Sequence, residues 1–210
     1  MLVTGLVAAQ VLALSGCSER VPIAAQVPAG ATVLAFGDSL TFGTGAPVGS
    51  GYPEQLAQLT AWRVVNAGVP GATAVDSAPR LTAALERHRP ALVIIGLGGN
   101  DLLRGIDEAR IRTALQNMIE LLDQARIPVV LVSVPRPSAL AAVAGALSDH
   151  PLYEDLAASA GVPLFADAWS EILSTRALRS DRIHANAEGY RRFAQRLAEF
   201  ARRAGILIDS

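Results

Sequence analysis

The chain has 210 residues, of which 51% are hydrophobic, and this supplies enough apolar surface for one globular core. The 18 basic and 19 acidic residues leave a formal net charge of -1, and all the basic side chains counted are arginines, spread singly or in short pairs. Because nucleic-acid-binding proteins carry concentrated positive charge, we expect no nucleic-acid partner. A small substrate that is uncharged or of mixed charge is expected instead.

The N-terminal segment has the pattern of an export signal. Residues 2–14 form an apolar run that is short for a bilayer span, and Leu14-Ser15-Gly16 leads into the only cysteine, Cys17. This resembles the lipobox of bacterial lipoproteins, in which cleavage precedes a cysteine that is then lipidated. An ordinary signal peptide or an uncleaved anchor is the alternative, since residues 1–5 contain no Lys or Arg.

We therefore expect a signal segment over residues 1–17, a linker over 18–30 and one domain from 31 to 210. The domain should work in the bacterial cell envelope, anchored to the membrane through Cys17 and facing the periplasm or the outside, or else be a soluble periplasmic or secreted protein. One cysteine excludes both an intramolecular disulfide and a Cys-rich metal site. No metal or cofactor is expected, and a monomer is favoured.

From residue 31 onward, short apolar runs alternate with longer amphipathic segments. The runs predict strands at 32–36, 63–66, 91–97, 129–134 and 162–165, and the helical periodicity predicts helices at 52–60, 73–88, 107–125, 153–160 and 186–204. The Ala-rich stretch 135–151 is expected to be a connection. Strands that are apolar on both faces and alternate with helices indicate a parallel sheet covered on both sides. The predicted fold is a three-layer α/β/α sandwich with about five parallel strands.

The stretch Val33-Leu34-Ala35-Phe36-Gly37-Asp38-Ser39 places a hydroxyl directly after the first predicted strand. Open α/β sheets bind ligands at the carboxyl ends of their strands, so Ser39 is the candidate nucleophile. A serine at this position is also common as a turn former or helix N-cap. The choice between these interpretations depends on whether a base and oxyanion donors exist elsewhere in the chain.

Three other stretches supply such groups. Gly71 lies in a glycine-rich turn after the second strand, where a backbone N–H can point at a developing oxyanion, and Asn100 follows the third strand and can offer its amide N–H. His184, just before the last helix, can deprotonate Ser39, and Asp181 can hold the imidazole in the required tautomer. Individually these residues are also typical of turns, helix caps and the surface. Together they provide a nucleophile, a base, an orienting carboxylate and oxyanion donors.

These residues resemble the four conserved blocks of the SGNH (GDSL) hydrolase family, in order and with the family's spacing. The blocks read Gly37-Asp38-Ser39-Leu40, Gly71, Gly98-Gly99-Asn100-Asp101 and Asp181-Arg182-Ile183-His184. Within the family the chain is most similar to the multifunctional thioesterase/lysophospholipases and the bacterial arylesterases. The resemblance implies the flavodoxin-like SGNH hydrolase fold, Ser39, His184 and Asp181 as a catalytic triad, and an oxyanion hole formed by the N–H groups of Ser39 and Gly71 with the Asn100 side chain. Ala72 departs from the family pattern, because the most similar members usually carry Asp there.

The expected reaction is hydrolysis of a small carboxylic ester through an acyl-enzyme, with aryl or short-to-medium acyl esters, thioesters or lysophospholipids as substrates. Leu102 and Leu103, which directly follow the third block, are the better candidates for contacting the acyl group, or else simply pack. The connection 135–151, which is apolar and low in charge, could also cover that group. A carbohydrate or peptidoglycan O-acetylesterase is the alternative enzyme.

Two other classes of protein are less compatible with the motifs. A nucleotide-binding module would need G-x-G-x-x-G or a P-loop, and the chain has neither, nor any lysine. An α/β-hydrolase would need G-x-S-x-G, but Thr41 occupies the place of the last glycine. A non-catalytic ligand-binding surface lipoprotein stays open.

Overall fold

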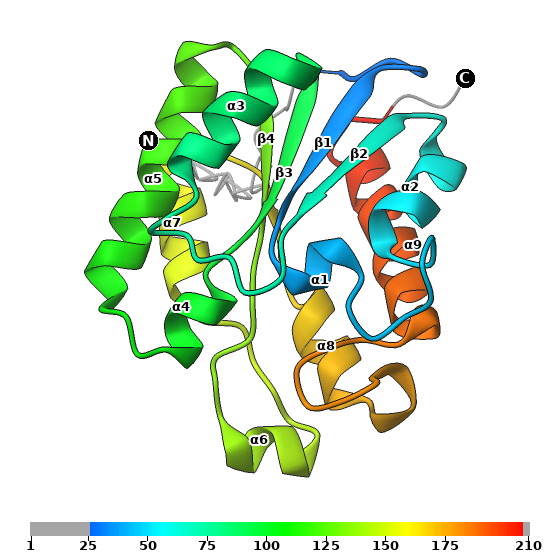
Figure 1. Ribbon diagram of the computed structural model, residues 1–210, viewed down its shortest axis with the longest axis vertical. Coiled ribbons are helices and arrows are strands. Elements are labelled where there is room, and N and C mark those ends of the chain that lie inside the picture. The colour runs from blue at the N-terminus through cyan, green and yellow to red at the C-terminus, as the bar shows by residue number, and fades with distance from the viewer. Residues whose placement is uncertain (1–25, 208–210) are drawn as a thin grey trace, which may run out of the picture.

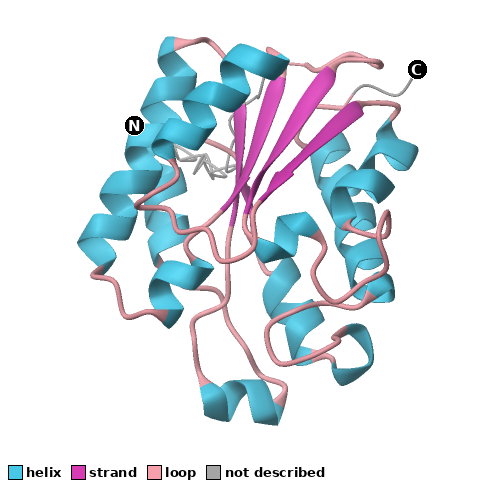
Figure 2. Cartoon of the chain, viewed as in Figure 1, coloured by secondary structure: helices cyan, strands magenta, loops and turns pink. Residues whose placement is uncertain are grey.

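The computed structural model describes residues 26–207, and the predicted signal segment, including Cys17, lies outside the described residues. A five-stranded parallel sheet forms the centre, with strand order β2-β1-β3-β4-β5 (Figures 1 and 2). The strands are β1 (Thr32–Gly37), β2 (Arg63–Gly68), β3 (Leu92–Gly96), β4 (Val129–Val132) and β5 (Leu164–Phe165). The longer helices are α2 (Tyr52–Thr60), α3 (Ala78–His88), α5 (Glu108–Gln124), α7 (Leu152–Ala160) and α9 (Ala187–Arg203). The shorter ones are α1 (Ser39–Phe42), α4 (Gly99–Leu103), α6 (Ala139–Ala144), α8 (Ala168–Ser174) and the 3-10 turn η1 (Arg176–Leu178).

The sheet is buried on both faces because its strands are apolar at successive positions. Side chains alternate between the faces of a strand, so Val33 and Ala35 of β1 join one apolar cluster while Leu34 and Phe36 join the other. Side chains of α2, α8 and α9 belong to the first cluster, and side chains of α3, α5 and α7 belong to the second. These helices therefore form the two outer layers (Figure 1). The predicted three-layer α/β/α sandwich with five parallel strands is confirmed.

The chain reverses its direction of winding between β1 and β3, which are adjacent in the sheet. Ligands of open α/β sheets bind outside the carboxyl ends of the strands at such a switch point. Three glycines, Gly68, Gly37 and Gly96, stand side by side in register there. A Cβ at Gly37 would collide with the side chain of Thr41, and a Cβ at Gly68 with the backbone of Phe42. The glycines therefore allow α1 to pack directly on the end of the sheet.

Several element boundaries differ from the sequence-based expectation. Helix α3 begins at Ala78 rather than at residue 73, because the preceding residues form a loop in which the Thr73 hydroxyl donates to Asp76 (2.7 Å). Helices α6 and α8 occupy stretches in which no helix was predicted. The end of the predicted linker also packs on the domain: Val27 is 1% exposed, and its N–H donates to the Ile206 carbonyl (2.8 Å).

Within residues 26–207, no helix combines the length and the apolar character that crossing a membrane requires.

Candidate active site

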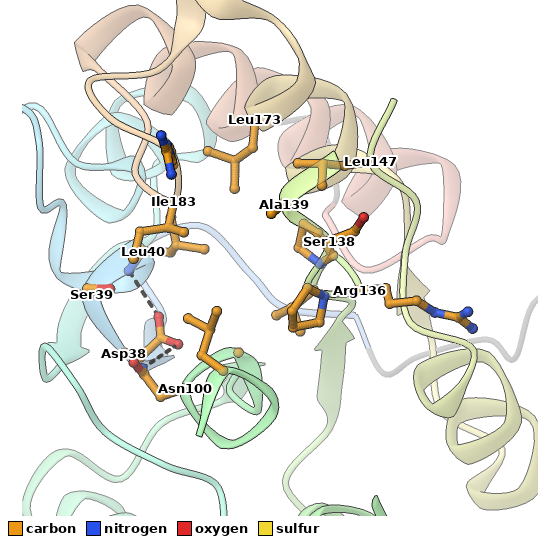
Figure 3. Close-up of a pocket in the computed structure, with 16 residues that line it drawn as sticks. Asp38, Ser39, Leu40, Asn100, Arg136, Ser138, Ala139, Leu147, Leu173 and Ile183 are labelled. Carbon is orange, nitrogen blue, oxygen red and sulfur yellow. Dashed lines mark hydrogen bonds between the residues drawn. The ribbon is translucent and has the colours of Figure 1, made fainter. Parts of the chain in front are cut away.

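The carboxyl ends of β1 and β3 border a cavity of about 340 Å³ at the switch point (Figure 3). Ser39 follows β1 and is the first residue of α1, and Asn100 is in α4 directly after β3. Both residues line the cavity. The first backbone N–H groups of a helix have no partner within it, so the start of α1 offers donors beside the Ser39 hydroxyl. The sheet thus brings a hydroxyl, a helix start and a side-chain amide to one edge.

The predicted base lies next to the predicted nucleophile. His184 Nε2 lies 3.0 Å from Ser39 Oγ, and His184 Nδ1 lies 2.7 Å from Asp181 Oδ2. With Nδ1–H donating to Asp181, the Nε2 lone pair is left to accept the hydroxyl hydrogen of Ser39. The structure therefore joins three side chains, from positions 39, 181 and 184, in one hydrogen-bonded chain.

The loop before α9 holds the histidine in this orientation. Asp181 Oδ1 accepts the backbone N–H groups of Ile183 and His184, both at 2.8 Å, while Oδ2 faces the imidazole. Partial burial raises the pKa of Asp181, but the hydrogen bonds from His184 and the two N–H groups outweigh burial, so the pKa lies below its usual value. The carboxylate is thereby kept ionised, as a partner that orients a histidine must be.

Comparison with known proteins shows which family the chain belongs to. The family model of the GDSL-like lipases and acylhydrolases matches residues 35–192, which contain both Ser39 and His184. This chain belongs to that family. Esterase TesA of Pseudomonas aeruginosa is 40% identical to it over 76 residues, 36% of this chain and 38% of TesA. Thioesterase 1/protease 1/lysophospholipase L1 of Escherichia coli K12 is 29% identical over 126 residues, 60% of each protein.

Among solved structures, the SGNH-hydrolase family esterase AlinE4 is 31% identical, with a TM-score of 0.56 over 66% of this chain and 77% of AlinE4. This GDSL chain spans less than two thirds of the length of the curated relatives from P. aeruginosa and E. coli.

In this GDSL protein, the aspartate of the first block is buried beside Ser39. Asp38 is 4% exposed, accepts the Leu40 N–H at 3.0 Å through Oδ1, and accepts Asn100 Nδ2 at 3.3 Å through Oδ2 (Figure 3). Burial raises the pKa of Asp38 to about 6, against the smaller lowering effects of the Leu40 N–H and of nearby His184. No role for Asp38 was predicted from the sequence, although it lies within the block Gly37-Asp38-Ser39-Leu40.

Both side-chain N–H groups of Asn100 are already hydrogen-bonded to the protein. Its Nδ2 donates to the Ala72 carbonyl at 3.0 Å as well as to Asp38, and a primary amide has only two hydrogens. The predicted oxyanion donor is therefore hydrogen-bonded to the protein itself, and the longer of its two bonds is the one to Asp38.

Helix α4 also fastens the loop that carries Gly71. Asp101, which is completely buried, accepts the N–H groups of Ala74 (2.7 Å) and Val75 (3.2 Å). The Arg104 guanidinium donates to the Gly71 carbonyl at 2.9 Å. Gly71 has a φ of 79°, a conformation that favours glycine, and Ala72 closes the turn by donating its N–H to the Val69 carbonyl. The turn thus forms with alanine at position 72.

The rest of the cavity wall is mainly apolar, and most of it comes from a segment expected to be a connection. We call residues 135–148, which contain α6, the arm. The lining residues outside the motif blocks are Leu103, Val134, Pro135, Arg136, Pro137, Ser138, Ala139, Leu147 and Leu173. Figure 3 shows Leu147, Leu173 and Ala139 across the cavity from Ser39.

Several predicted site residues do not line the cavity, among them Leu102, Gly71 and His184. Leu103 lines the cavity, whereas Leu102 packs against the apolar cluster under α5 and α7. Helical geometry explains the difference, because consecutive residues of α4 point in directions about 100° apart. Gly71 and His184 are not among the residues that line this cavity; His184 approaches Ser39 from beside it.

Proposed function

We propose that this protein is a serine esterase in which Ser39 is the nucleophile, His184 the general base and Asp181 the residue that orients the histidine. The observation that carries the proposal is the hydrogen-bonded chain from Ser39 Oγ to His184 (3.0 Å) and on to Asp181 (2.7 Å), at the edge of an apolar cavity. The esterase and thioesterase/lysophospholipase names of the relatives support the same reaction class.

The reaction follows from these contacts. Ser39 Oγ forms a bond to the ester carbonyl carbon as its proton passes to His184 Nε2, and the carbonyl oxygen becomes an oxyanion. His184 then gives this proton to the departing alcohol or thiol, leaving an acyl group on Ser39. Water attacks the acyl-enzyme in the same way, releases the acid and restores the hydroxyl. Asp181 stabilises the imidazolium that forms in both steps.

The oxyanion would be held by the N–H groups of Ser39 and Gly71 and by the Asn100 amide. Because both hydrogens of that amide are engaged, substrate has to displace one existing acceptor. The 3.3 Å bond to Asp38 is the longer, so we propose that this one is exchanged for the oxyanion while the bond to Ala72 keeps the amide in place. Asp38 would then act as a stand-in acceptor that holds Asn100 ready.

The apolar wall favours an acyl chain over an acetylated sugar. The side chains of Leu103, Leu147 and Leu173 offer no hydrogen-bonding groups to sugar hydroxyls, and they remove hydrocarbon from water. We therefore place short-to-medium acyl esters, thioesters and lysophospholipids ahead of carbohydrate O-acetyl groups.

The decisive experiment measures hydrolysis of nitrophenyl esters from acetyl to decanoyl by the wild type and by Ser39→Ala. The wild type should prefer the longer esters of this series to acetyl, and the Ser39→Ala variant should lose the activity. A fluorophosphonate probe should label the wild type and leave the variant unlabelled. Equal rates for the two proteins would refute the proposed nucleophile. A clear preference for acetyl esters would refute the acyl-chain assignment and favour the O-acetylesterase.

We also propose that the enzyme acts as a monomer in the cell envelope, lipid-anchored through Cys17. This part depends on the sequence of residues 1–17, which the structure does not describe. Replacement of Cys17 by Ser should abolish labelling by radioactive palmitate in a bacterial host and release the enzyme from the membrane fraction. Labelling that persists in the variant would refute the anchor.

A further inference from the structure

The tip of the arm exposes large apolar side chains to solvent. Leu140 is 80% exposed and Val143 is 76% exposed, and the whole stretch 137–148 contains no charged residue. In Figure 1 the arm extends beyond the carboxyl end of the sheet, with α6 farthest from the strands. Solvent-exposed apolar groups gathered on one protruding segment are typical of an interaction site rather than of ordinary surface.

Hydrogen bonds at both ends of the arm fix it to the rest of the domain, and this keeps its tip exposed. Residues Pro135 and Asp149 form a β-bridge, and the Arg136 N–H donates to the Ser148 carbonyl at 2.8 Å. The Leu147 N–H donates to Ser174 Oγ of α8 at 2.9 Å. The Asp149 carboxylate accepts the hydroxyls of Ser133 and Ser170 and the N–H of Asp167, which ties the arm to β4 and α8. With both ends of the arm fixed in this way, the tip is held away from the core.

Positive charge borders the arm. Arg136, at the base of the arm, and Arg182, in the loop before α9, are both exposed, and both line the cavity together with residues of the arm. The carboxylate next to Arg182 in the chain is Asp181. That carboxylate is hydrogen-bonded to His184, so it offers little compensation to the arginines. Figure 3 shows that the guanidinium of Arg136 points away from the cavity. The apolar tip therefore stands beside cationic groups.

We propose that the tip of the arm, through Leu140 and Val143, inserts into a lipid surface that carries anionic headgroups, while the flanking arginines contact those headgroups. Apolar residues that enter the boundary between headgroups and acyl chains, with basic residues beside them, are the combination that holds proteins at such surfaces. A second copy of the chain fits less well, because a symmetric contact between two tips would bring two arginine-rich borders together.

Insertion would connect the lipid surface with the cavity. Ala139, directly before Leu140, and Leu147, after the tip, both line the cavity, so an acyl chain leaving the surface along the arm reaches the apolar wall facing Ser39. This consequence rests on the proposed esterase function, whereas the insertion itself does not.

The test uses a tryptophan as a local reporter in the full-length protein. The two native tryptophans, Trp62 and Trp169, are 3% and 2% exposed, so their emission should be insensitive to lipid. The variant Leu140→Trp is mixed with vesicles of phosphatidylcholine and phosphatidylglycerol, with or without brominated acyl chains. Val48→Trp is the matched control, because Val48 is fully exposed in a loop distant from the arm in sequence and outside the cavity lining. The added emission of Leu140→Trp should shift to the blue and be quenched by bromine, and that of Val48→Trp should not.

Equal quenching at the two positions would overturn the proposal, since it would reflect attachment through another part of the chain. An added emission that is already blue-shifted without vesicles and depends on protein concentration would show a second copy at the tip, and would also overturn it. Because charge complementarity selects the lipid, Arg136→Glu combined with Arg182→Glu should weaken quenching in vesicles that contain phosphatidylglycerol. None of these measurements requires catalysis, so an inactive enzyme whose tip is quenched would refute the esterase and leave the insertion standing.

Discussion

The two walls of the cavity are built on different principles. The polar wall comes from the ends of β1 and β3, and its side chains Asp38, Ser39 and Asn100 are each hydrogen-bonded to a group of the protein. The apolar wall comes from the arm and α8, and it offers Leu147 and Leu173 without any such fixed partner for its side chains. The sheet therefore positions the groups proposed to be catalytic, whereas the arm and α8 shape the surface that would contact the substrate.

If the polar wall and the loop that holds His184 work as one hydrogen-bonded unit, removing the acceptor that faces the imidazole should have a large effect on activity. In Asp181→Asn, Oδ1 can still accept the Ile183 and His184 N–H groups, but an NH₂ replaces the oxygen that faces His184 Nδ1. The histidine then adopts the wrong tautomer, and kcat on a nitrophenyl ester should fall by up to about 10⁴-fold. Asp107→Asn, at the exposed N-cap of α5, is the control and should leave kcat unchanged. A loss below about tenfold at position 181 would show that Asp181 has no orienting role.

Removal of one hydrogen-bond donor from the polar wall should reduce kcat by a smaller factor. In Asn100→Ala the amide that bridges Asp38 and the Ala72 carbonyl is lost, and with it one proposed oxyanion donor. We expect kcat to fall by about 10²- to 10³-fold with little change in KM, because the interaction forms mainly in the transition state. A variant in which KM rises and kcat is preserved would assign Asn100 to substrate binding instead.

The polar wall was predictable from the sequence because each of its groups follows a buried strand or precedes a helix. Parallel strands end at one edge, so Ser39 and Asn100 had to meet there, and the motif spacing added His184. The hydrogen bonds within that wall were harder to predict from the sequence. Nothing in the order of residues shows that both hydrogens of Asn100 would be taken, or that Asp101 would bind the N–H groups of Ala74 and Val75 across 27 and 26 positions.

The apolar wall was predicted only in part, for a different reason. The stretch 135–151 has no clear periodicity and many alanines, so it was expected to be a connection that could cover an acyl group, without a helix. Helix α6 depends on its N-cap, where Ser138 Oγ accepts the Ala141 N–H, and on contact with α8. Leu102 illustrates the same difficulty, because only the rotation of a short helix decides which of two adjacent leucines reaches the cavity. Short segments whose structure depends on tertiary contacts are beyond what local patterns encode.

The buried carboxylate of Asp38 in the polar wall should make the free energy of unfolding depend on pH. Burial raises the pKa of Asp38 from 3.8 to about 6, so the folded protein binds this proton more tightly than the unfolded chain does. The resulting stabilisation is fully present below about pH 4 and is lost as the pH rises through 6. Asp38→Asn cannot titrate at this position. Wild-type stability should therefore fall by about 2.5 kcal/mol relative to the variant between pH 4 and 7, as measured by urea unfolding. Parallel stability curves would mean that Asp38 is as well solvated in the folded state as in the unfolded chain.

The smallest effect is expected at the tip of the apolar wall, where Leu140→Ser should change the free energy of unfolding by no more than about 0.5 kcal/mol. The reason is that Leu140 is 80% exposed, so its replacement removes almost no buried area. Urea unfolding without lipid makes the measurement, and Leu59→Ser, at a leucine of α2 that is 39% exposed, provides a comparison at which more apolar contact is lost. A loss of 2 kcal/mol or more at position 140 would mean that this side chain packs against another part of the protein or a second copy, and the contrast between the two walls would fail. A neutral result would mean that folding gains nothing from a leucine at the tip, and the benefit of an apolar residue there would have to come from a contact outside the fold.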